Sequence, residues 1–240
     1  MHRVDREPAF VLHRRAFRET SLTVELLTAT HGRVAGVARG ARGPRSALRP
    51  LGQPFVPLEV SWVRRGEMAT LTGAEPVGRT AVPTGRALWC ALYANELLLK
   101  LLPRDVEESE VFIAYARLLP ALADAAHQSQ ALRRFEMVLL DALGVAPELD
   151  VVGEARIAVD PDGWYRVDPV RGPEPVAGPA SKGQDSSGPE QAVSGDLLRA
   201  LAAGCELSPE QAAAARRLMR KLIEHQLDGR RLETPRLYRE

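Results

Sequence analysis

The sequence predicts an α+β protein, with a five-stranded β-barrel at the N-terminus followed by a mainly α-helical domain that carries a small β-hairpin. Two observations carry this prediction. Short segments rich in β-branched and aromatic residues fill residues 9–77, and turn signals separate them. After Pro83 the apolar residues recur with the 3.6-residue period of a helix. We therefore expect a barrel domain in residues 1–80 and a helical domain in residues 81–240.

Five segments have the composition of strands: AFVLHRR, SLTVELLTA, RVAGVAR, FVPLEVSWV and MATLTGAEPV. The pairs His31-Gly32 and Arg65-Gly66 mark two of the turns between them. Five strands in so short a stretch favour a closed sheet, because closure removes exposed strand edges. A barrel of the oligonucleotide-binding type is the expected form, and an open meander is the alternative.

Helical periodicity divides the segment after Pro83 into three helices. The first ends at Pro103, which cannot continue a helix. The second is expected over residues 109–125, with Ser109 as its N-cap, and the third over residues 130–143.

The rest of the chain has three parts. Residues 155–168 have the pattern of a β-hairpin with its turn at residues 161–163. Residues 169–195 are rich in Pro, Gly and Ser and nearly lack large apolar side chains, so we expect a flexible loop there. Two helices close the chain, and the last begins at a capping box that starts with Ser208.

Charge is unevenly distributed, although the net formal charge is only +1. Residues 1–80 contain 13 arginines against 7 acidic residues, and residues 212–240 contain 8 basic against 4 acidic residues. Residues 103–160 have the reverse excess, with 5 arginines against 11 acidic residues. Two basic ends around an acidic middle are typical of a protein that binds a polyanion, and an ordinary solvated surface is the alternative.

The cysteines and the hydropathy pattern predict a cytoplasmic protein. Cys90 and Cys205 lie in apolar helix-like segments without a second ligand nearby, so we expect both to be core thiols in a reducing compartment. No apolar segment reaches the roughly 18 residues that span a bilayer, and the N-terminus lacks the pattern of a secretion signal. No membrane contact is expected.

An arginine-rich loop follows the third predicted strand. Arg39, Arg42, Arg45 and Arg49 recur every three or four residues among glycines and a proline that keep the segment irregular. Forked guanidinium groups beside accessible backbone N–H groups match phosphate. We expect these four arginines, with Arg14 after the first strand, to contact phosphates, and a solubilising surface loop is the alternative.

Four aromatic residues of the barrel segment could serve either of two purposes. Phe10, Phe17, Phe55 and Trp62 offer flat rings on which nucleic-acid bases can stack. Each ring also suits the core of a small barrel, which is the more common place for such a side chain.

The last helix carries a second predicted basic surface. A helical projection at about 100° per residue places Arg216, Arg217, Arg220 and Lys221 on one face, opposite the apolar side chains. Only Glu224 lies within this basic face, so its charge is undercompensated. The face suits a phosphate backbone or an acidic partner, and a plain solvated helix face is the alternative.

The segment ALRRFEMVLLDALG gives a different projection. Arg133 lies between Met137 and Leu140, whereas Arg134 lies on another face beside an aspartate. A guanidinium next to apolar side chains is a candidate receptor for a peptide carboxylate. An internal ion pair between Arg133 and Glu136 is the alternative.

The sequence supports no catalytic, metal or cofactor site. The five histidines lie far apart without partnering cysteine or carboxylate motifs, and no serine has the G-x-S-x-G context of a nucleophile. The sequence GARGPR lacks the Lys-Ser/Thr ending of a nucleotide-triphosphate loop. We therefore expect a protein that is not an enzyme, and a nuclease without a recognisable motif is an alternative.

Several segments together resemble the RecO family of DNA repair and recombination mediator proteins. They are AFVLHRRAFRETSLTVELLT, HGRVAGVARGARGPRSALRPLGQPFVPLEV, GEMATLTGAEPV, LYANELLLKLLP and LRRFEMVLLDALG. Their order and spacing match over residues 8–147, and the final basic helix matches more weakly. V-A-[KR]-G-A-R followed by QPF.PL, with LRRFE..LL..LG downstream, is specific as a combination, although each motif alone is weak.

The resemblance implies a mediator of homologous recombination in the RecFOR pathway, located in the cytoplasm at the nucleoid. Such a protein binds single- and double-stranded DNA, anneals complementary strands, engages the C-terminal tail of single-strand-binding protein, and works with RecR to load RecA. Because that tail is acidic and ends in an aromatic residue with a free carboxylate, Arg133, Met137 and Leu140 are its candidate receptor. The two basic surfaces are then DNA-binding sites. A basic adaptor that binds acidic proteins without contacting DNA is the alternative.

The chain departs from the family in one respect. Many relatives carry a four-cysteine zinc cluster after the third helix, whereas residues 147–195 contain no cysteine. Without thiolate ligands we expect no zinc in this region, and we expect no other cofactor.

Overall fold

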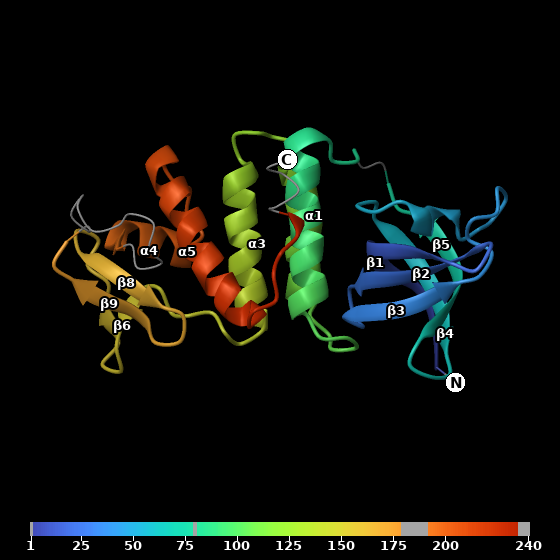
Figure 1. The fold of residues 1–240 in the computed structure, drawn as a ribbon, viewed down its shortest axis with the longest axis horizontal. Helices are drawn as coiled ribbons and strands as arrows, with labels where there is room; N and C mark the ends of the chain where they lie inside the picture. Colours follow the sequence, from blue (N-terminus) through green and yellow to red (C-terminus); the bar gives the residue numbers. More distant parts are fainter. Residues whose placement is uncertain (1, 79–80, 179–191, 235–240) are drawn as a thin grey trace. The chain divides into compact units, whose positions relative to one another are not determined.

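The structure is a computed structural model that describes residues 2–78, 81–178 and 192–234 (Figure 1). The chain divides into two compact units, one of residues 1–128 with residues 232–240, and one of residues 129–231. The first unit contains a closed five-stranded barrel and two helices, and the second contains helices and small sheets. This confirms the predicted α+β class with an N-terminal barrel.

The barrel strands are β1 (His2–Phe17), β2 (Ser21–Thr28), β3 (Arg33–Ala38), β4 (Leu58–Arg64) and β5 (Ala69–Pro76). They close in the order β1-β2-β3-β5-β4, and every neighbouring pair is antiparallel except β3 and β5, which are parallel. This closed barrel confirms the predicted oligonucleotide-binding type and excludes the open meander.

β1 is longer than predicted because its two halves pair with different neighbours. Residues from His2 to Ala9 pair with β4, and residues from Ala9 to Phe17 pair with β2. Register shifts after Val4 and after Val11 bend the strand so that it can serve both partners. The N-terminal half is polar and contains a proline, so it lacks the alternation by which a strand is recognised in sequence.

Barrel closure depends on a close approach between β3 and β5. Gly36 pairs with Ala69, and a Cβ atom on Gly36 would lie 2.1 Å from the Leu71 side chain. A larger residue at this position would displace the buried Leu71 side chain from the barrel interior. Apolar side chains fill the barrel interior, and those that are almost fully buried include Val11, Leu26, Leu58, Val60 and Trp62.

Two helices, α1 (Gly85–Leu101) and α2 (Ser109–Ala121), complete the first unit, and α1 lies beside the barrel (Figure 1). A buried polar chain links three elements. Tyr115 Oη on α2 donates to Asn95 Oδ1 on α1 at 2.5 Å, and Asn95 Nδ2 donates to the Leu12 carbonyl on β1 at 2.8 Å. Burial raises the pKa of the Tyr115 hydroxyl, so this group stays protonated and able to donate.

α2 differs from its prediction at both ends. The Glu108 carbonyl already accepts a hydrogen bond from Phe112 N, so Glu108 is the N-cap and the predicted cap, Ser109, is the first helical residue. The helix ends at Ala121 instead of residue 125, because the chain turns around Asp124. That carboxylate accepts from Ala126 N at 2.9 Å and lies 2.7 Å from His127 Nδ1.

The second unit contains α3 (Gln128–Ala142) and two small sheets. β6 (Val151–Val152) pairs with β7 (Ile157–Ala158), while β8 (Trp164–Asp168) lies between β9 (Gly172–Val176) and β10 (Val193–Ser194). The predicted hairpin over residues 155–168 is therefore wrong. A turn does form after Asp160, but it connects strands of two different sheets.

The predicted flexible loop, residues 169–195, is partly structured. β9 and β10 fall within it, and both pair with β8. Residues 179–191 of that prediction lie outside the described residues.

The last two helices, α4 (Gly195–Ala202) and α5 (Pro209–Leu227), pack with β8 around a second core. Ser208 Oγ accepts from Gln211 N at 3.2 Å and Gln211 Oε1 accepts from Ser208 N at 2.8 Å, which confirms the predicted capping box. Gly204, at φ +63°, ends α4 in a Schellman motif and leaves Cys205 exposed just beyond it. The prediction of a core thiol is wrong for Cys205, and Cys90 is half-buried.

Candidate nucleic-acid interface

The end of the β1–β2 hairpin is exposed and basic. Every side chain from His13 to Thr20 is exposed, so the burial of side chains in the middle of β1 stops there. Phe17 pairs with Ser21, and three residues form the turn between them. Arg18 begins this turn at φ +54°, in the left-handed region that a residue with a Cβ atom rarely adopts.

The arginine-rich loop after β3 is folded into successive tight turns. Backbone hydrogen bonds join Gly43 to Gly40, Ser46 to Gly43 and Arg49 to Ser46, and a short 3-10 helix (Arg49–Gly52) follows. Because these bonds recur every three residues, arginines three or four residues apart repeat along the outside of the loop. All four predicted loop residues are exposed, namely Arg39, Arg42, Arg45 and Arg49.

Arg42 attaches this loop to the hairpin. Its backbone N–H donates to the Thr20 carbonyl at 2.9 Å, and its Nη1 donates to the Glu19 carbonyl at 3.1 Å. The strand register agrees with this contact, because Ala38, at the end of β3, pairs with Leu22 at the start of β2. The hairpin turn and the beginning of the loop therefore lie at the same end of the barrel.

We call the exposed arginines of these two segments the arginine surface: Arg14, Arg15, Arg18, Arg39, Arg42, Arg45 and Arg49. Within the described part of the chain, none of them forms an ion pair with a carboxylate. Guanidinium groups that are exposed and lack an internal counter-charge are available to an external anion.

Other arginines of the first unit are used internally. Arg3 pairs with Asp5, Arg6 with Glu59, Arg64 with Asp105, and both Arg33 and Arg104 with Glu25. We call Glu25, Arg33 and Arg104 the Glu25 cluster. Hydrogen bonding to Glu25 raises the pKa of the Arg104 guanidinium, whereas burial lowers the pKa of the Arg33 guanidinium, whose Nη1 also donates to the Leu99 carbonyl at 2.7 Å.

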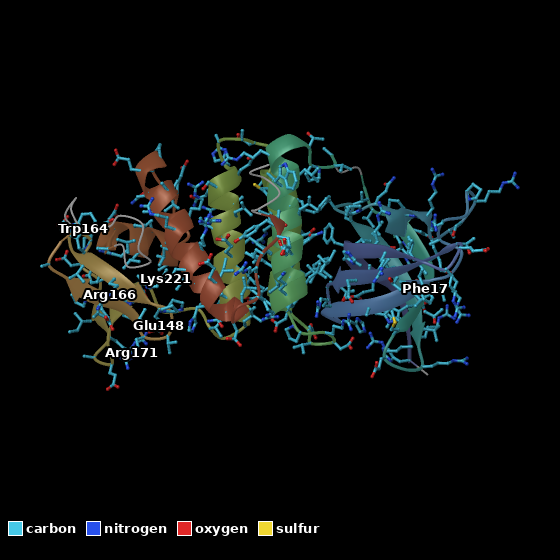
Figure 2. All side chains as sticks on the ribbon, in the orientation of Figure 1. Phe17, Glu148, Trp164, Arg166, Arg171 and Lys221 are labelled. Atoms are coloured by element: carbon cyan, nitrogen blue, oxygen red, sulfur yellow. The ribbon has the colours of Figure 1, made fainter. Side chains whose placement is uncertain are left out.

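The four barrel aromatics separate into core and surface. Phe10, Phe55 and Trp62 are buried, with at most 5% of each residue exposed, so none of the three offers a face to a ligand. Phe17 is 38% exposed and lies on the barrel, within the basic hairpin (Figure 2). The Arg18 guanidinium carbon lies 5.1 Å from the centroid of its ring.

Only part of the predicted basic face of α5 is available to bind an external anion. Arg216, Arg217 and Arg220 are exposed, and no ion pair involves them among residues 192–234 or the other described ranges. Lys221 is half-buried and points from α5 to β8 (Figure 2), where its Nζ donates to the Val167 carbonyl at 2.8 Å. Lys221 therefore has fewer donors for an external anion than its three neighbours.

Arg133 is buried against Glu136. Its Nη2 donates to Glu136 Oε1 at 2.6 Å, and the two side chains are 7% and 0% exposed. Arg133 Nε is buried without a hydrogen-bond partner among the described residues. Leu140 is also buried and Met137 is half-buried, so little of this predicted receptor reaches the surface of the molecule.

Arg134 is exposed but held in place. Its Nε and Nη2 both donate to the Gly204 carbonyl, at 3.0 and 2.7 Å, which fixes the guanidinium at the end of α4. Helical projection had placed Arg134 beside Asp141, but the loop after α4 supplies its acceptor instead. This contact comes from a residue distant in sequence, so the helix pattern alone does not reveal it.

Comparison with known families identifies the chain. A family model described as "Recombination protein O N terminal" matches residues 1–79, and one described as "Recombination protein O C terminal" matches residues 83–235. The chain belongs to the RecO family.

Curated RecO proteins match nearly the whole chain. It is 39% identical over 241 residues to the DNA repair protein RecO of Dechloromonas aromatica (strain RCB), covering 99% of this chain and 96% of that protein. The RecO proteins of Methylococcus capsulatus (strain Bath) and Aromatoleum aromaticum are 41% and 42% identical, with 94% and 96% of their lengths covered. The function of the chain therefore lies in DNA repair and recombination, as a mediator and not an enzyme.

The described residues of this RecO protein show neither a metal cluster nor a membrane span. No three His, Cys, Asp or Glu side chains in residues 2–78, 81–178 and 192–234 are arranged to hold a metal ion. In the same ranges no helix is long and apolar enough to cross a membrane.

The sequence predicts Arg14 as a phosphate contact, allows Arg15 and Arg18 to extend the same surface, and leaves Phe17 open as a stacking ring or a core side chain. The structure places all four on the exposed end of the hairpin. A signal for them is present in the sequence HRRAFRET, where three arginines interrupt the apolar pattern next to a turn.

Proposed function

We propose that this RecO protein is a recombination mediator that binds single- and double-stranded DNA and anneals complementary strands. In this proposal it also helps to load RecA onto strands coated with single-strand-binding protein, together with RecR, in the cytoplasm at the nucleoid. Its DNA contacts are Arg14, Arg39, Arg42, Arg45 and Arg49 on the barrel, and Arg216, Arg217 and Arg220 on α5. Lys221 on the same helix contributes least, because its Nζ donates to the Val167 carbonyl.

The observation that carries this proposal is the absence of carboxylate partners on the arginine surface within the described chain. Barrels of this type bind oligonucleotides with one sheet face and with the loops after the first and fourth strands. The arginine surface includes the turn after β1, and Arg42 brings the β3–β4 loop against that turn. The charge and the loop after the first strand thus indicate the same end of the barrel, whereas the loop after β4 lies beside the start of β1.

Annealing has a direct physical basis in such a surface. Two complementary strands repel each other through their phosphates, and arginines that bind phosphate reduce this repulsion. Phosphate contacts leave the base edges free, so the bases of two bound strands can still pair. Binding energy then comes mainly from charge and is independent of sequence, as a mediator that acts at any damaged site requires.

The tail of single-strand-binding protein is proposed to bind at Arg133, Met137 and Leu140. In support, Arg133 has an unsatisfied Nε beside apolar side chains, and its guanidinium can bind a terminal carboxylate with two hydrogen bonds. Because Arg133 is buried with Glu136, tail binding requires the Arg133–Glu136 pair to open. Arg134, already bound to the Gly204 carbonyl, is the matched control.

A peptide titration separates the two arginines. Arg133→Ala should weaken binding of the acidic tail peptide by on the order of 2 kcal/mol, because a charge-assisted contact is lost. Its affinity for bare DNA should stay unchanged, since the arginine surface carries that binding. If Arg133→Ala binds the peptide normally, or if only Arg134→Ala loses it, Arg133 is a structural partner of Glu136 and nothing more.

An annealing assay tests the whole proposal. Complementary strands coated with single-strand-binding protein should anneal faster with the protein present, and replacement of Arg39 and Arg45 by glutamate should remove most of the gain. An adaptor that binds only acidic proteins would give no binding to bare strands at low salt, and that result would refute the DNA-binding proposal. Metal-dependent shortening of the strands would indicate a nuclease instead.

A further inference from the structure

Phe17 is the exposed exception among the aromatic side chains. In the described part of the chain, every other Phe, Tyr and Trp is buried or half-buried, whereas Phe17 is 38% exposed at the end of β1 (Figure 2). Exposure of an aromatic surface is unfavourable, and the exposed part of this ring is accessible to a partner outside the chain.

The setting of Phe17 is strongly basic. Arg14, Arg15 and Arg18 belong to the same hairpin end, and Arg42 from the next loop contacts its turn through the Glu19 carbonyl. A partner for this ring must therefore bring negative charge together with an apolar face. Each nucleotide of a DNA strand supplies both, since its phosphate and its flat base are attached to the same sugar.

The backbone at Arg18 adds a second, independent observation. Its φ of +54° is disfavoured for a residue with a Cβ atom, and glycine or asparagine is the usual choice for such a turn position. In this conformation the Arg18 guanidinium lies over the Phe17 ring, 5.1 Å from its centroid. A cation at this distance helps to hold the ring in place, and 38% of the residue remains accessible to a base.

We propose that Phe17, backed by Arg18, is a stacking platform for an unpaired base. This deepens the proposed DNA-binding function, on which it rests, by naming the form of DNA that the hairpin recognises. A base within a duplex is covered by its neighbours on both faces, so it cannot stack on a protein ring without leaving the helix. Phosphate contacts do not discriminate in this way, and Phe17 is thus the residue that gives the barrel a preference for single strands.

The test compares two variants on three ligands, using the full chain. Phe17→Leu keeps an apolar side chain but removes the flat face, and Val77→Ala is the matched control, because Val77 is an exposed apolar residue of the same unit at 46%. The ligands are a single-stranded oligonucleotide, the duplex of the same length, and a single strand of abasic sites that retains every phosphate. Fluorescence anisotropy at fixed low salt gives the three affinities.

Phe17→Leu should bind the base-bearing single strand about tenfold more weakly, as loss of one base–aromatic stack predicts. Its affinity for the duplex and for the abasic strand should change less than about twofold, and Val77→Ala should match the unchanged protein on all three ligands. In a Phe17→Trp variant, the base-bearing strand should quench the added tryptophan and the abasic strand should not.

Two results would overturn the stacking platform alone. One is a Phe17→Leu protein that binds the single strand as tightly as the unchanged protein, and the other is an equal loss on base-bearing and abasic strands. If the unchanged protein binds none of the three ligands, the DNA-binding proposal fails and the platform with it. A loss restricted to an acidic protein partner would assign Phe17 to a protein interface and likewise overturn the platform.

Discussion

The arginine surface and the Glu25 cluster lie in the same unit and both contain arginines, but these arginines have different roles. Those of the cluster bind an internal carboxylate, and those of the surface are available to an external anion. In the cluster, Arg33 and Arg104 contact Glu25, and Arg33 Nη1 also donates to the last turn of α1 through the Leu99 carbonyl. On the arginine surface the guanidinium groups have no carboxylate partner in the described chain. The number of arginines in the barrel segment therefore overstates the charge available to DNA.

The Glu25 cluster connects segments that are far apart in sequence. Arg104 follows α1, and the main chain beside it approaches the β2–β3 turn so closely that a Cβ atom on Gly32 would lie 1.7 Å from the Val106 carbonyl oxygen. Asp105 N also donates to the Arg33 carbonyl at 3.0 Å. The cluster is thus part of the attachment of the barrel to the segment after α1, and its charges are satisfied by this attachment.

The largest expected effect comes from breaking the cluster. Glu25→Gln removes the carboxylate that Arg33, only 14% exposed, shares with Arg104, so the free energy of unfolding should fall by about 2 kcal/mol. DNA affinity should not change, because no member of the arginine surface is touched. Urea unfolding and anisotropy on the same samples measure the two quantities.

Glu59→Gln is the matched control for this prediction. It breaks the Arg6–Glu59 pair, in which Arg6 is 71% exposed, and pairs of that kind contribute at most about 1 kcal/mol. Equal destabilisation by the two variants would mean that burial does not distinguish the cluster from an ordinary surface pair.

The second effect comes from reversing charge on the arginine surface. Four or five phosphate contacts on the arginine surface should contribute about −3 to the slope of the logarithm of single-strand affinity against the logarithm of salt, roughly a 60-fold loss from 50 to 200 mM. Arg39→Glu with Arg45→Glu removes two of these contacts, which should reduce this contribution to about −1.6. Stability should change little, since neither side chain has a hydrogen-bond or ion-pair partner to lose among the described residues.

Reversal of two paired arginines separates specific contacts from total charge. Arg3→Glu with Arg6→Glu makes the same change in net charge on the same barrel, but both side chains already face carboxylates. If this control flattens the salt dependence as much as the Arg39 and Arg45 variant does, the protein binds DNA through its overall charge and the arginine surface has no special role.

Sequence patterns predict the five barrel strands and their closure, except for the N-terminal half of β1, and they do not predict the small sheets. The five barrel strands alternate with clear turn signals, and closure follows from the need to cover their edges. In the second unit the signal at residues 161–163 is a real turn, but a turn does not specify which strands pair across it. β7 pairs with the strand before it in sequence, β6, and β8 pairs with the strand after it, β9. Long-range packing alone decides which strands pair.

The same limit applies to the candidate site. The exposure of Arg39 and Arg45 could be predicted because glycines and a proline keep their loop irregular. The attachment of Arg134 to the Gly204 carbonyl could not be, because that loop is distant in sequence. For Arg133 the helix spacing did suggest Glu136, since residues three apart are neighbours on a helix, and the structure shows this contact.

A third, smaller effect compares two neighbouring cations on α5. Arg220 is exposed, whereas Lys221 donates to the Val167 carbonyl. Arg220→Gln should lower the magnitude of the salt slope by about 0.7, the value for one phosphate contact on a single strand. Lys221→Gln should leave the slope nearly unchanged and instead lower stability by about 1 kcal/mol, through loss of its hydrogen bond. The opposite pattern would place Lys221, and not Arg220, on the DNA.

The smallest effect concerns a carboxylate held mainly by neutral donors instead of arginines. Glu96 on α1 accepts from Glu233 N at 2.8 Å, from Thr234 N at 2.9 Å and from Thr234 Oγ1 at 2.7 Å, and Lys100 Nζ lies 3.3 Å away. Burial raises the pKa of the Glu96 carboxyl, but these hydrogen bonds outweigh burial and hold the pKa below its ordinary value of 4.5. The charged form is thus favoured in the folded state.

The sign of the pH dependence follows from this direction. Because the pKa of Glu96 is lower in the folded than in the unfolded state, its stabilisation is complete above about pH 4.5 and is lost as the pH falls through the folded pKa. At pH 7, Glu96→Gln should therefore lower the free energy of unfolding by no more than about 1 kcal/mol, and the difference should shrink below pH 4. Glu75→Gln, at an exposed carboxylate on β5, is the control for the loss of one negative charge from the same unit. A difference for Glu96→Gln that grows as the pH falls would mean that its neighbours favour the protonated carboxyl, and that neutral donors do not replace arginine in holding this charge.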